Sequence, residues 1–411
     1  MSIRFDDRVT IVTGAGQGLG RCHALDLASR GAKVVVNDLG GSVDGSGGSS
    51  AAALSVVEEI KAAGGQAIAN GANVANFDEV QAMVQQTMDE WGRVDVLINN
   101  AGILRDKSFT KGSLEDFKLV LDVHLMGTVN CTKAVWDIMR EQNYGRVLVT
   151  SSGSGLYGNF GQSNYGSAKT GVVGLMNTLV LEGAKNNIKV NTLVPTAGTR
   201  MTEGLVAPEV FDMLTPESVT PAATFLVSED APNKTMISVG AGGYALVKIV
   251  ETDGIWLAQE DQTAEAIAAN WEQICDPEGE TVPAQGSEQP MKFLGKAQQA
   301  LQTQTSQSSQ VNTMNEAEKY NLSVQSPMGK QESELFLSQD GEALSGKMIA
   351  ANGESNIEDG KADGDQLSWS VKLDKPMPVT LTFSGTRNGD GIEGEVAFGA
   401  FGKGPFTATK A

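Results

Sequence analysis

The chain has 411 residues, of which 40% are hydrophobic and 20% are charged, and this length and composition are typical of a globular protein with two or more domains. The formal net charge of −19 excludes a general basic surface, so we expect no binding to nucleic acid or to anionic membranes. No stretch approaches about 18 uninterrupted apolar residues, which argues against membrane insertion, and the three cysteines are too scattered for a disulfide framework.

From Val9 to about Ala258, short β-branched segments alternate with longer amphipathic segments, which is the pattern of βαβ units in a parallel sheet. The predicted strands are residues 9–12, 33–36, 94–98, 147–149 and 189–193. The predicted crossover helices are residues 19–29, 51–63, 78–91, 113–141 and 165–185, and a further helix starts at Thr215-Pro216-Glu217. The sequence therefore predicts an α/β fold with a Rossmann-type, doubly wound parallel sheet in a domain that we assign to residues 1–275.

The remainder of the chain has a different composition. Residues 276–320 are rich in Gln, Ser, Thr, Glu and Gly, which predicts a polar linker, within which residues 291–301 can form one or two helical turns against the first domain. In residues 321–411 the hydrophobic period changes to two, and turn-strand segments recur every 23 to 25 residues, beginning at Gly341, Gly364 and Gly389. This pattern predicts a small antiparallel all-β domain, whose role is either stability and oligomerisation or the binding of a substrate or partner.

A glycine-rich turn follows the first predicted strand and consists of Gly14, Gly16, Gly18, Leu19 and Gly20. Small residues there let backbone amides approach a pyrophosphate at the positive end of the first helix. Asp38, at the end of the second strand, is suitably placed to accept hydrogen bonds from both ribose hydroxyls of an adenosine, and no Arg or Lys follows closely to neutralise a 2′-phosphate. These features predict a dinucleotide site that prefers NAD over NADP.

Tyr165 and Lys169 are spaced by one helical turn, and Ser152 precedes Tyr165 by thirteen residues. An ammonium group beside a phenol favours the phenolate, so we expect Lys169 to lower the pKa of Tyr165 enough for it to accept a proton near neutrality. Ser151 and Ser154 compete with Ser152 as the hydroxyl that orients the reacting oxygen, and the spacing favours Ser152. Beside a dinucleotide, this set predicts hydride transfer, and no metal site is expected.

Over roughly residues 4–257, these motifs resemble those of the short-chain dehydrogenase/reductase family: the turn Thr13–Gly20, the run Asn99-Asn100-Ala101-Gly102, and Ser152 with Tyr165 and Lys169. The resemblance implies that Tyr165 exchanges a proton with the substrate oxygen, that Lys169 also holds the nicotinamide ribose, and that Ser152 bonds the reacting oxygen. It further implies residues that border the cofactor, with Asn73 and Val74 beside the adenine and Asn100, Ala101 and Gly102 beside the ribose.

Longer segments resemble the dehydrogenase domains of the peroxisomal type 2 multifunctional enzymes of β-oxidation: residues 33–41 with the Gly/Ser insertion that follows, 123–127, 154–162 and 195–202. This resemblance implies NAD-dependent oxidation of (3R)-3-hydroxyacyl-CoA to 3-ketoacyl-CoA by a homodimer, with Pro195 and Thr199 beside the nicotinamide. The segment that follows residue 202, as far as Leu214, would be a substrate lid or a simple connecting loop. Because no hydratase signature follows, we expect a separate enoyl-CoA hydratase in the same pathway. His124 replaces the asparagine of most family members, as is typical of this subgroup, and is either part of a proton relay through its carbonyl or a separate acid/base catalyst.

Other interpretations remain open. Within the enzyme class they are a hydroxysteroid dehydrogenase and a 3-ketoacyl-carrier reductase, and Asp38 disfavours the second because biosynthetic reduction usually draws on NADPH. The alternative that is not an enzyme is an NAD-binding scaffold or sensor. The intact set of Ser152, Tyr165 and Lys169 disfavours this alternative. The amino terminus lacks the features of a signal peptide and the ending is not of the Ser-Lys-Leu type, so we expect a cytoplasmic location.

Overall fold

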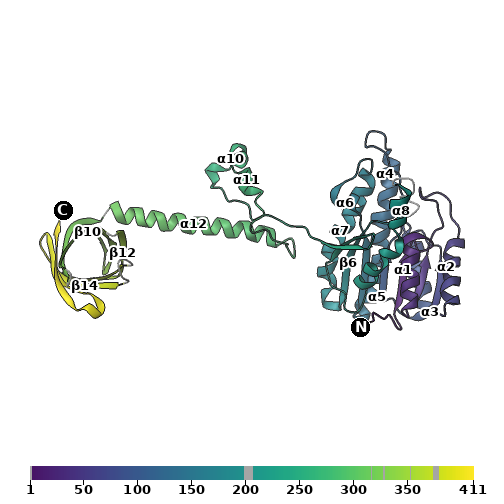
Figure 1. Ribbon diagram of the computed structural model, residues 1–411, viewed down its shortest axis with the longest axis horizontal. Coiled ribbons are helices and arrows are strands. Elements are labelled where there is room, and N and C mark those ends of the chain that lie inside the picture. Colours follow the sequence, from purple (N-terminus) through teal and green to yellow (C-terminus); the bar gives the residue numbers. More distant parts are fainter. Residues whose placement is uncertain (1, 199–206, 316, 327–328, 352, 374–378) are drawn as a thin grey trace. The chain divides into compact units, whose positions relative to one another are not determined.

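The structure is a computed structural model that describes the chain except for residues 1, 199–206, 316, 327–328, 352 and 374–378. Contacts divide the chain into two compact units, Met1–Glu251 and Thr252–Ala411. The first is an α/β unit, and the second contains helices and a barrel (Figure 1). In the described part of the chain, no helix is both long and apolar enough to cross a membrane.

An eight-stranded sheet forms the centre of the first unit, in the order β3-β2-β1-β4-β5-β6-β7-β8. All neighbouring strands are parallel except β7 and β8. The strands are β1 (Val9–Thr13), β2 (Lys33–Asn37), β3 (Gln66–Asn70), β4 (Val96–Asn99), β5 (Gly145–Thr150), β6 (Ile188–Pro195), β7 (Met236–Gly240) and β8 (Gly243–Val247). The predicted doubly wound sheet is confirmed, and the strand order reverses between β1 and β4, where such sheets bind ligands at the carboxyl ends of their strands.

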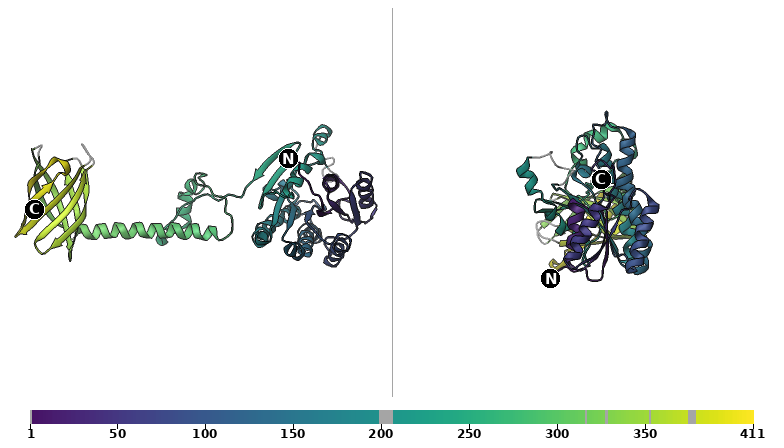
Figure 2. Two further views of the ribbon diagram at one scale, coloured as in Figure 1. Left: turned by 90° about the horizontal axis from the view of Figure 1, so that it is seen from below. Right: turned by 90° about the vertical axis from the view of Figure 1, so that its right-hand side faces the viewer.

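Helices cover both faces of this sheet (Figure 2). They are α1 (Gly18–Ser29), α2 (Ala51–Ala62), α3 (Phe77–Trp91), α4 (Leu114–Leu121), α5 (Gly127–Gln142), α6 (Gly153–Tyr157), α7 (Ser163–Gly183), α8 (Pro208–Met213) and α9 (Thr220–Leu226). Because neighbouring residues of a strand point to opposite faces, Val34 packs in the core under α1, α2 and α9, and Val35 packs in the core under α3, α5 and α7. The predicted helix over residues 113–141 is interrupted by a π-helical turn, Asp122–Met126, between α4 and α5.

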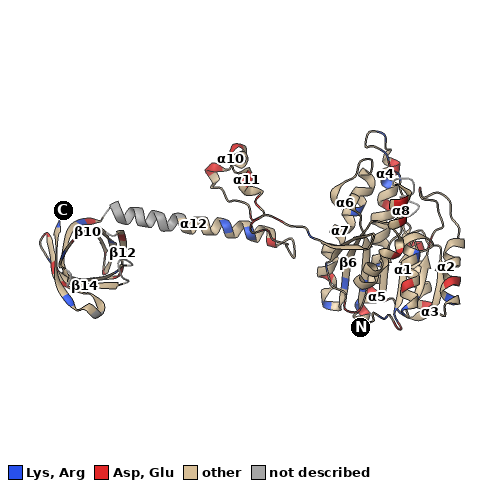
Figure 3. Cartoon of the chain, in the orientation of Figure 1, with Lys and Arg blue, Asp and Glu red and all other residues tan. Residues whose placement is uncertain are grey.

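The second unit begins before the segment that the sequence predicted as a polar linker, residues 276–320, and much of that segment is helical. The described α-helices of the second unit are α10 (Ala264–Ala269), α11 (Trp271–Ile274) and α12 (Glu288–Asn315), and α12 is the one that lies in the predicted linker. The basic side chains of α12 lie in its amino-terminal part (Figure 3). There Lys292 donates a hydrogen bond to the carbonyl of Thr252 at 2.8 Å, and Lys296 pairs with Asp253 at 2.6 Å. These contacts join residues 252 and 253 to α12, and the division of the chain by contacts places residues 252–275 in the second unit.

The predicted all-β domain is a closed antiparallel barrel. Its strands are β9 (Glu318–Ser326), β10 (Gly329–Asp340), β11 (Ala343–Ala350), β12 (Gly353–Asp363), β13 (Gln366–Leu373), β14 (Val379–Asn388), β15 (Gly391–Ala397) and β16 (Lys403–Lys410). Alternate residues point inward and form a core, in which Trp369 stacks on Phe383 with 5.0 Å between ring centroids, and Phe406 meets both rings edge-on. The barrel therefore supplies its own hydrophobic core.

Candidate active site

The glycine-rich turn joins β1 to the amino end of α1. Gly14 and Gly18 have φ angles of +62° and +54°, a left-handed conformation that favours glycine. A Cβ atom at Gly20 would overlap the carbonyl oxygen of Gly14, so the close packing of the helix against the turn also requires glycine there. Gly18 and Leu19, the first residues of α1, line a pocket, and the amino end of a helix beside a pocket is the arrangement that binds a pyrophosphate.

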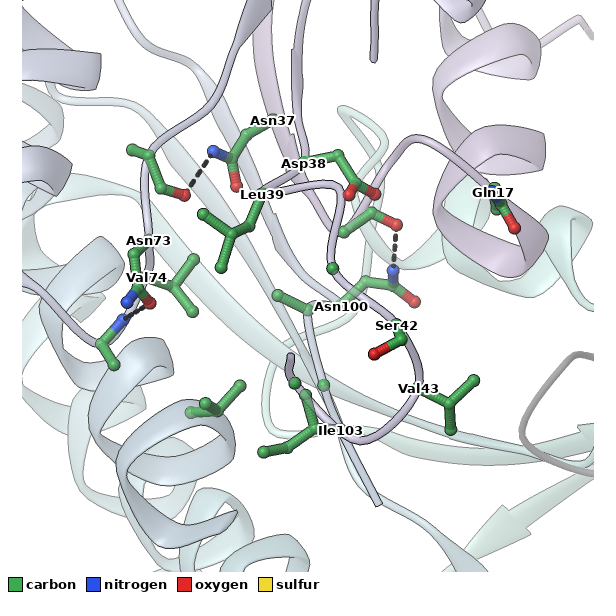
Figure 4. A pocket seen from close by; sticks show the side chains of 18 of the residues that line it. Gln17, Asn37, Asp38, Leu39, Ser42, Val43, Asn73, Val74, Asn100 and Ile103 are labelled. Carbon is green, nitrogen blue, oxygen red and sulfur yellow. Dashed lines mark hydrogen bonds between the residues drawn. The ribbon is translucent and has the colours of Figure 1, made fainter. Parts of the chain in front are cut away.

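Asp38 follows β2 and faces the same turn (Figure 4). Its carboxylate accepts hydrogen bonds from the backbone amides of Gly16 at 2.8 Å and Gly40 at 2.7 Å. A Cβ at Gly16 would lie 2.8 Å from the Asp38 oxygen, so glycine is needed for this approach. The two amides fix the orientation of the carboxylate and leave it lone pairs for further donors, such as ribose hydroxyls.

Asn100, just after β4, holds the glycine turn from the other side. Its side-chain amide donates to the carbonyl oxygens of Thr13 and Gly14, both at 3.0 Å. The Thr13 hydroxyl in turn accepts from the amides of Asn100 at 3.0 Å and Ala101 at 3.1 Å. The predicted run of residues 99–102 thus positions the turn by hydrogen bonds as well as bordering the pocket.

The pocket between these elements contains most of the predicted cofactor residues. It is lined by Gly14, Gly18, Leu19, Asp38, Asn73, Val74, Asn100, Ala101 and Gly102. Gly16 and Gly20 are not among the lining residues, nor is Pro195, which ends β6. Ser42, Val43, Gly45 and Ile103 also line it and were not predicted, although the Gly/Ser insertion that contains three of them was visible in the sequence. The glycine turn, the fixed carboxylate and the lining together fit a dinucleotide.

Ser152, Tyr165 and Lys169 meet beyond the carboxyl end of β5. Ser152 is the N-cap of α6 and accepts a hydrogen bond from the amide of Ser154 at 3.2 Å. Tyr165 lies on α7 and shares a hydrogen bond with Ser152. Lys169, one turn later, is 4% exposed, and its ammonium group donates to the carbonyl of Thr150 at 2.6 Å. The structure therefore brings the predicted chemical residues together, at the same edge of the sheet as the pocket.

The electrostatics of this cluster differ from the expectation that Lys169 lowers the pKa of Tyr165. Burial raises the pKa of Tyr165 above its ordinary value of 10.0, and the hydrogen bond with Ser152 opposes this rise only in part. The Lys169 ammonium is 5.6 Å from the centroid of the phenol ring and bonds the Thr150 carbonyl instead. Burial also lowers the pKa of Lys169 to about 7, because the interior penalises its charge. Ser152, rather than Lys169, is thus the group that favours the phenolate in this geometry.

His124 lies on the π-helical turn and packs edge-on against Tyr165, with 5.1 Å between ring centroids. Its Nε2 atom is 2.7 Å from the carbonyl oxygen and 3.0 Å from the amide nitrogen of Ile103. Burial, and secondarily the charge of Lys169, lower the pKa of His124 to about 3. The ring is neutral near pH 7, which favours a positioning role over acid/base catalysis. His23 has its pKa lowered to about 4 by burial and pairs with Thr220 at 2.9 Å, as a structural residue of α1.

Two further predicted segments are the lid before Leu214 and the turn at Asn73 and Val74. Thr199 and the first part of the predicted lid, through residue 206, fall outside the described residues, and the rest of the lid contains α8. Asn73 accepts a hydrogen bond from the amide of Ala75 at 3.0 Å, and the carbonyl of Val74 accepts one from Asn130 at 2.9 Å. The turn after β3 is therefore fixed at the pocket edge, where an adenine ring is expected.

The sequence profile of the family described as short chain dehydrogenase matches residues 8–209. The chain is 50% identical over 280 residues to peroxisomal multifunctional enzyme type 2 of Mus musculus, covering 67% of this chain and 37% of that protein. It is 50% identical over 274 residues to a short-chain type dehydrogenase/reductase of Mycobacterium tuberculosis, covering 66% and 96%, respectively. A solved 7α-hydroxysteroid dehydrogenase, complexed with NADH and 7-oxoglycochenodeoxycholic acid, has a TM-score of 0.53 and 29% identity, covering 58% of this chain and 95% of that one.

Proposed function

Because this chain belongs to the short-chain dehydrogenase family, we propose that it oxidises a (3R)-3-hydroxyacyl-CoA to the 3-ketoacyl-CoA with NAD in a β-oxidation-type pathway. The observation that carries the redox role is the partly buried Tyr165, which is hydrogen-bonded to Ser152, with the buried Lys169 one turn away. The thioester substrate is supported by the likeness to peroxisomal multifunctional enzyme type 2, of which the chain spans 37%. An enoyl-CoA hydratase activity would supply the hydroxyacyl substrate.

Bound NAD would supply the hydride acceptor. In the proposed oxidation, the Tyr165 phenolate takes the proton of the substrate hydroxyl as hydride leaves the carbinol carbon, so an O–H and a C–H bond break while the carbonyl forms. Ser152, which is hydrogen-bonded to the Tyr165 phenol, would hold the reacting oxygen of the substrate beside that phenol. Lys169 would hold the ribose and relay the proton from Tyr165 towards solvent.

The preference for NAD over NADP rests on Asp38, whose charge would repel a 2′-phosphate. The three residues that follow it, Leu39-Gly40-Gly41, bring no positive charge. We expect Asp38→Ser to lower the preference for NAD, measured as the ratio of kcat/KM with NAD to kcat/KM with NADP, by at least tenfold. An unchanged ratio would contradict the role of Asp38.

The redox assignment is tested by Tyr165→Phe, which keeps the ring and removes the proton acceptor. We expect NADH formation from (3R)-3-hydroxyacyl-CoA to fall by at least about a hundredfold, since general-base catalysis contributes about 10²–10⁴-fold. Tyr157→Phe is the matched control, because Tyr157 is 74% exposed, and it should keep wild-type rates. Wild-type turnover by Tyr165→Phe would place the catalytic base elsewhere.

A hydroxysteroid substrate is the second candidate, which the likeness to 7α-hydroxysteroid dehydrogenase favours. Initial rates with acyl-CoA thioesters, acyl-carrier thioesters and free sterols distinguish the candidates, including the carrier reductase. Turnover of free sterols alone would reject the thioester assignment. NADH that binds without turnover of any class would instead support a scaffold or sensor.

Assembly as a homodimer is also a proposal. It is supported by the edge strand β8, where Tyr244 and Leu246 are 53% and 59% exposed, since exposed edge strands and apolar side chains favour association. Light scattering would give the mass of the assembly. A cytoplasmic location is a proposal as well, and the name of the mouse relative makes the peroxisome the alternative for imaging to decide.

For the barrel, the packed interior favours a role in stability or assembly over the binding of a ligand inside it. Deletion of residues 318–411 should therefore change the assembly mass or the melting temperature more than kcat. Unchanged mass, stability and kinetics would eliminate both roles considered for the barrel, including binding of a substrate or partner.

A further inference from the structure

The insertion between β2 and α2 lines part of the dinucleotide pocket, and we call residues 39–50 the strap. Nine of its twelve residues are Gly or Ser, so its fixed course costs more conformational entropy than that of an ordinary loop. Ser42, Val43 and Gly45 line the pocket together with Asp38 and Ile103, and Figure 4 shows Ser42 and Val43 beside the other labelled residues. A ligand in the pocket would therefore lie against the strap.

The strap is held from across the pocket by the segment that follows Gly102. The amide of Leu104 donates to the carbonyl of Val43 at 2.9 Å, and Nε of Arg105 donates to the carbonyl of Asp44 at 2.7 Å. The Arg105 guanidinium also faces the Asp44 carboxylate at 3.9 Å. Both side chains of that ion pair are partly exposed, so the backbone contacts contribute more than the charge pair.

Arg105 also connects the strap to the chemical site. Its carbonyl accepts a hydrogen bond from the side-chain amide of Asn164 at 3.1 Å, and Asn164 accepts one from the amide of Tyr165 at 2.7 Å. Asp116 pairs with Arg105 at 3.4 Å from the opposite side. The same residue thus touches the wall of the cofactor pocket and the first turn of the catalytic helix.

We propose that the strap closes over the bound dinucleotide and that Arg105 is its latch, so that this contact sets the affinity and the release rate of NAD(H). The inference rests on the cofactor assignment made under the proposed function. Because release of reduced cofactor can limit turnover in enzymes with closing loops, the latch would also control kcat.

Arg105→Ala tests the latch in the full-length protein. We expect the Kd for NADH, measured by its fluorescence, to rise about tenfold, the size expected for the loss of one charge-assisted hydrogen bond. The NADH release rate, measured by stopped-flow displacement, should rise by a similar factor. Asp116→Asn is the control, since it breaks the second ion pair of Arg105 without touching the strap, and it should stay within twofold of wild type.

A pair of glycine variants tests the strap independently of charge. Gly45 and Gly47 have similar φ angles, +86° and +78°, so an alanine at either position carries similar backbone strain. A Cβ at Gly45 would lie 3.2 Å from Ile103, whereas a Cβ at Gly47 meets nothing within 4 Å. We expect Gly45→Ala to weaken NADH binding about three- to tenfold, and Gly47→Ala to stay within about twofold of wild type.

Hydrogen exchange gives a readout that needs no turnover. NADH should slow amide exchange in the strap of the wild-type protein, and Arg105→Ala should reduce this protection. If wild type binds NADH but Arg105→Ala and Gly45→Ala bind and release it within twofold of wild type, the strap inference is wrong. If wild type binds no NADH, it is the cofactor assignment that fails.

Discussion

Replacement of Lys169 by Met should stabilise the protein while it abolishes catalysis. The Lys169 side chain is 4% exposed, and burial lowers its pKa from 10.5 to about 7. Each pKa unit corresponds to about 1.4 kcal/mol, so keeping this ammonium charged in the interior costs roughly 5 kcal/mol. The variant also loses the hydrogen bond from Lys169 to Thr150, and this loss cancels about 1–2 kcal/mol of the stability gained by removing the buried charge. The expected net gain below pH 7 is about 3 kcal/mol.

The sign of the pH dependence follows from the two pKa values of Lys169. Between about pH 7 and 10.5 the unfolded chain holds a proton that the folded chain has released, so the free energy of unfolding of the wild type rises with pH. Below pH 7 both states are protonated, and the destabilisation is complete. The methionine variant lacks this titration. Its advantage over wild type should therefore be largest below pH 7 and shrink steadily towards pH 10.5.

Urea unfolding of the full-length proteins, followed by circular dichroism at about pH 6, 8 and 10, measures this difference. Lys133→Met is the matched control, because Lys133 is exposed on α5, and it should change the free energy of unfolding by less than about 0.5 kcal/mol at each pH. A Lys169→Met protein that is less stable than wild type at pH 6 would refute the reasoning. A gain in the free energy of unfolding that is the same at all three pH values would also refute it.

Three further outcomes are expected. Gly20→Ala should abolish NADH binding in a fluorescence titration, because its Cβ would overlap the Gly14 carbonyl, whereas Gly71→Ala, with open space around its Cβ, should bind normally. His124→Ala should lower kcat at least tenfold without moving the pH profile, because the ring is already neutral; a shifted profile would instead indicate acid/base catalysis. Because burial raises the pKa of Tyr165, kcat/KM for oxidation should rise with pH from about 6 to 9, and a flat profile would contradict a phenolate base.

The site could be found from the sequence where its residues are local. The left-handed turn at Gly14 and Gly18 needs glycine whatever surrounds it, and the spacing of Tyr165 and Lys169 places both on one face of a helix. The polar composition of the α12 region predicts a linker, and composition does not reveal the contacts that Lys292 and Lys296 make with residues far away in the chain.

The sequence by itself determined the doubly wound α/β unit and the β unit, and it predicted the chemical residues, because hydrophobic period, turn glycines and helical spacing act over a few neighbours. Only the tertiary structure decided that Arg105 meets Asp44 and that the neutral His124 ring fixes the Ile103 backbone. It also decided that burial, opposed by Ser152, governs the pKa of Tyr165. Each of these depends on the distance and desolvation of groups from different strands and helices, which no local pattern encodes.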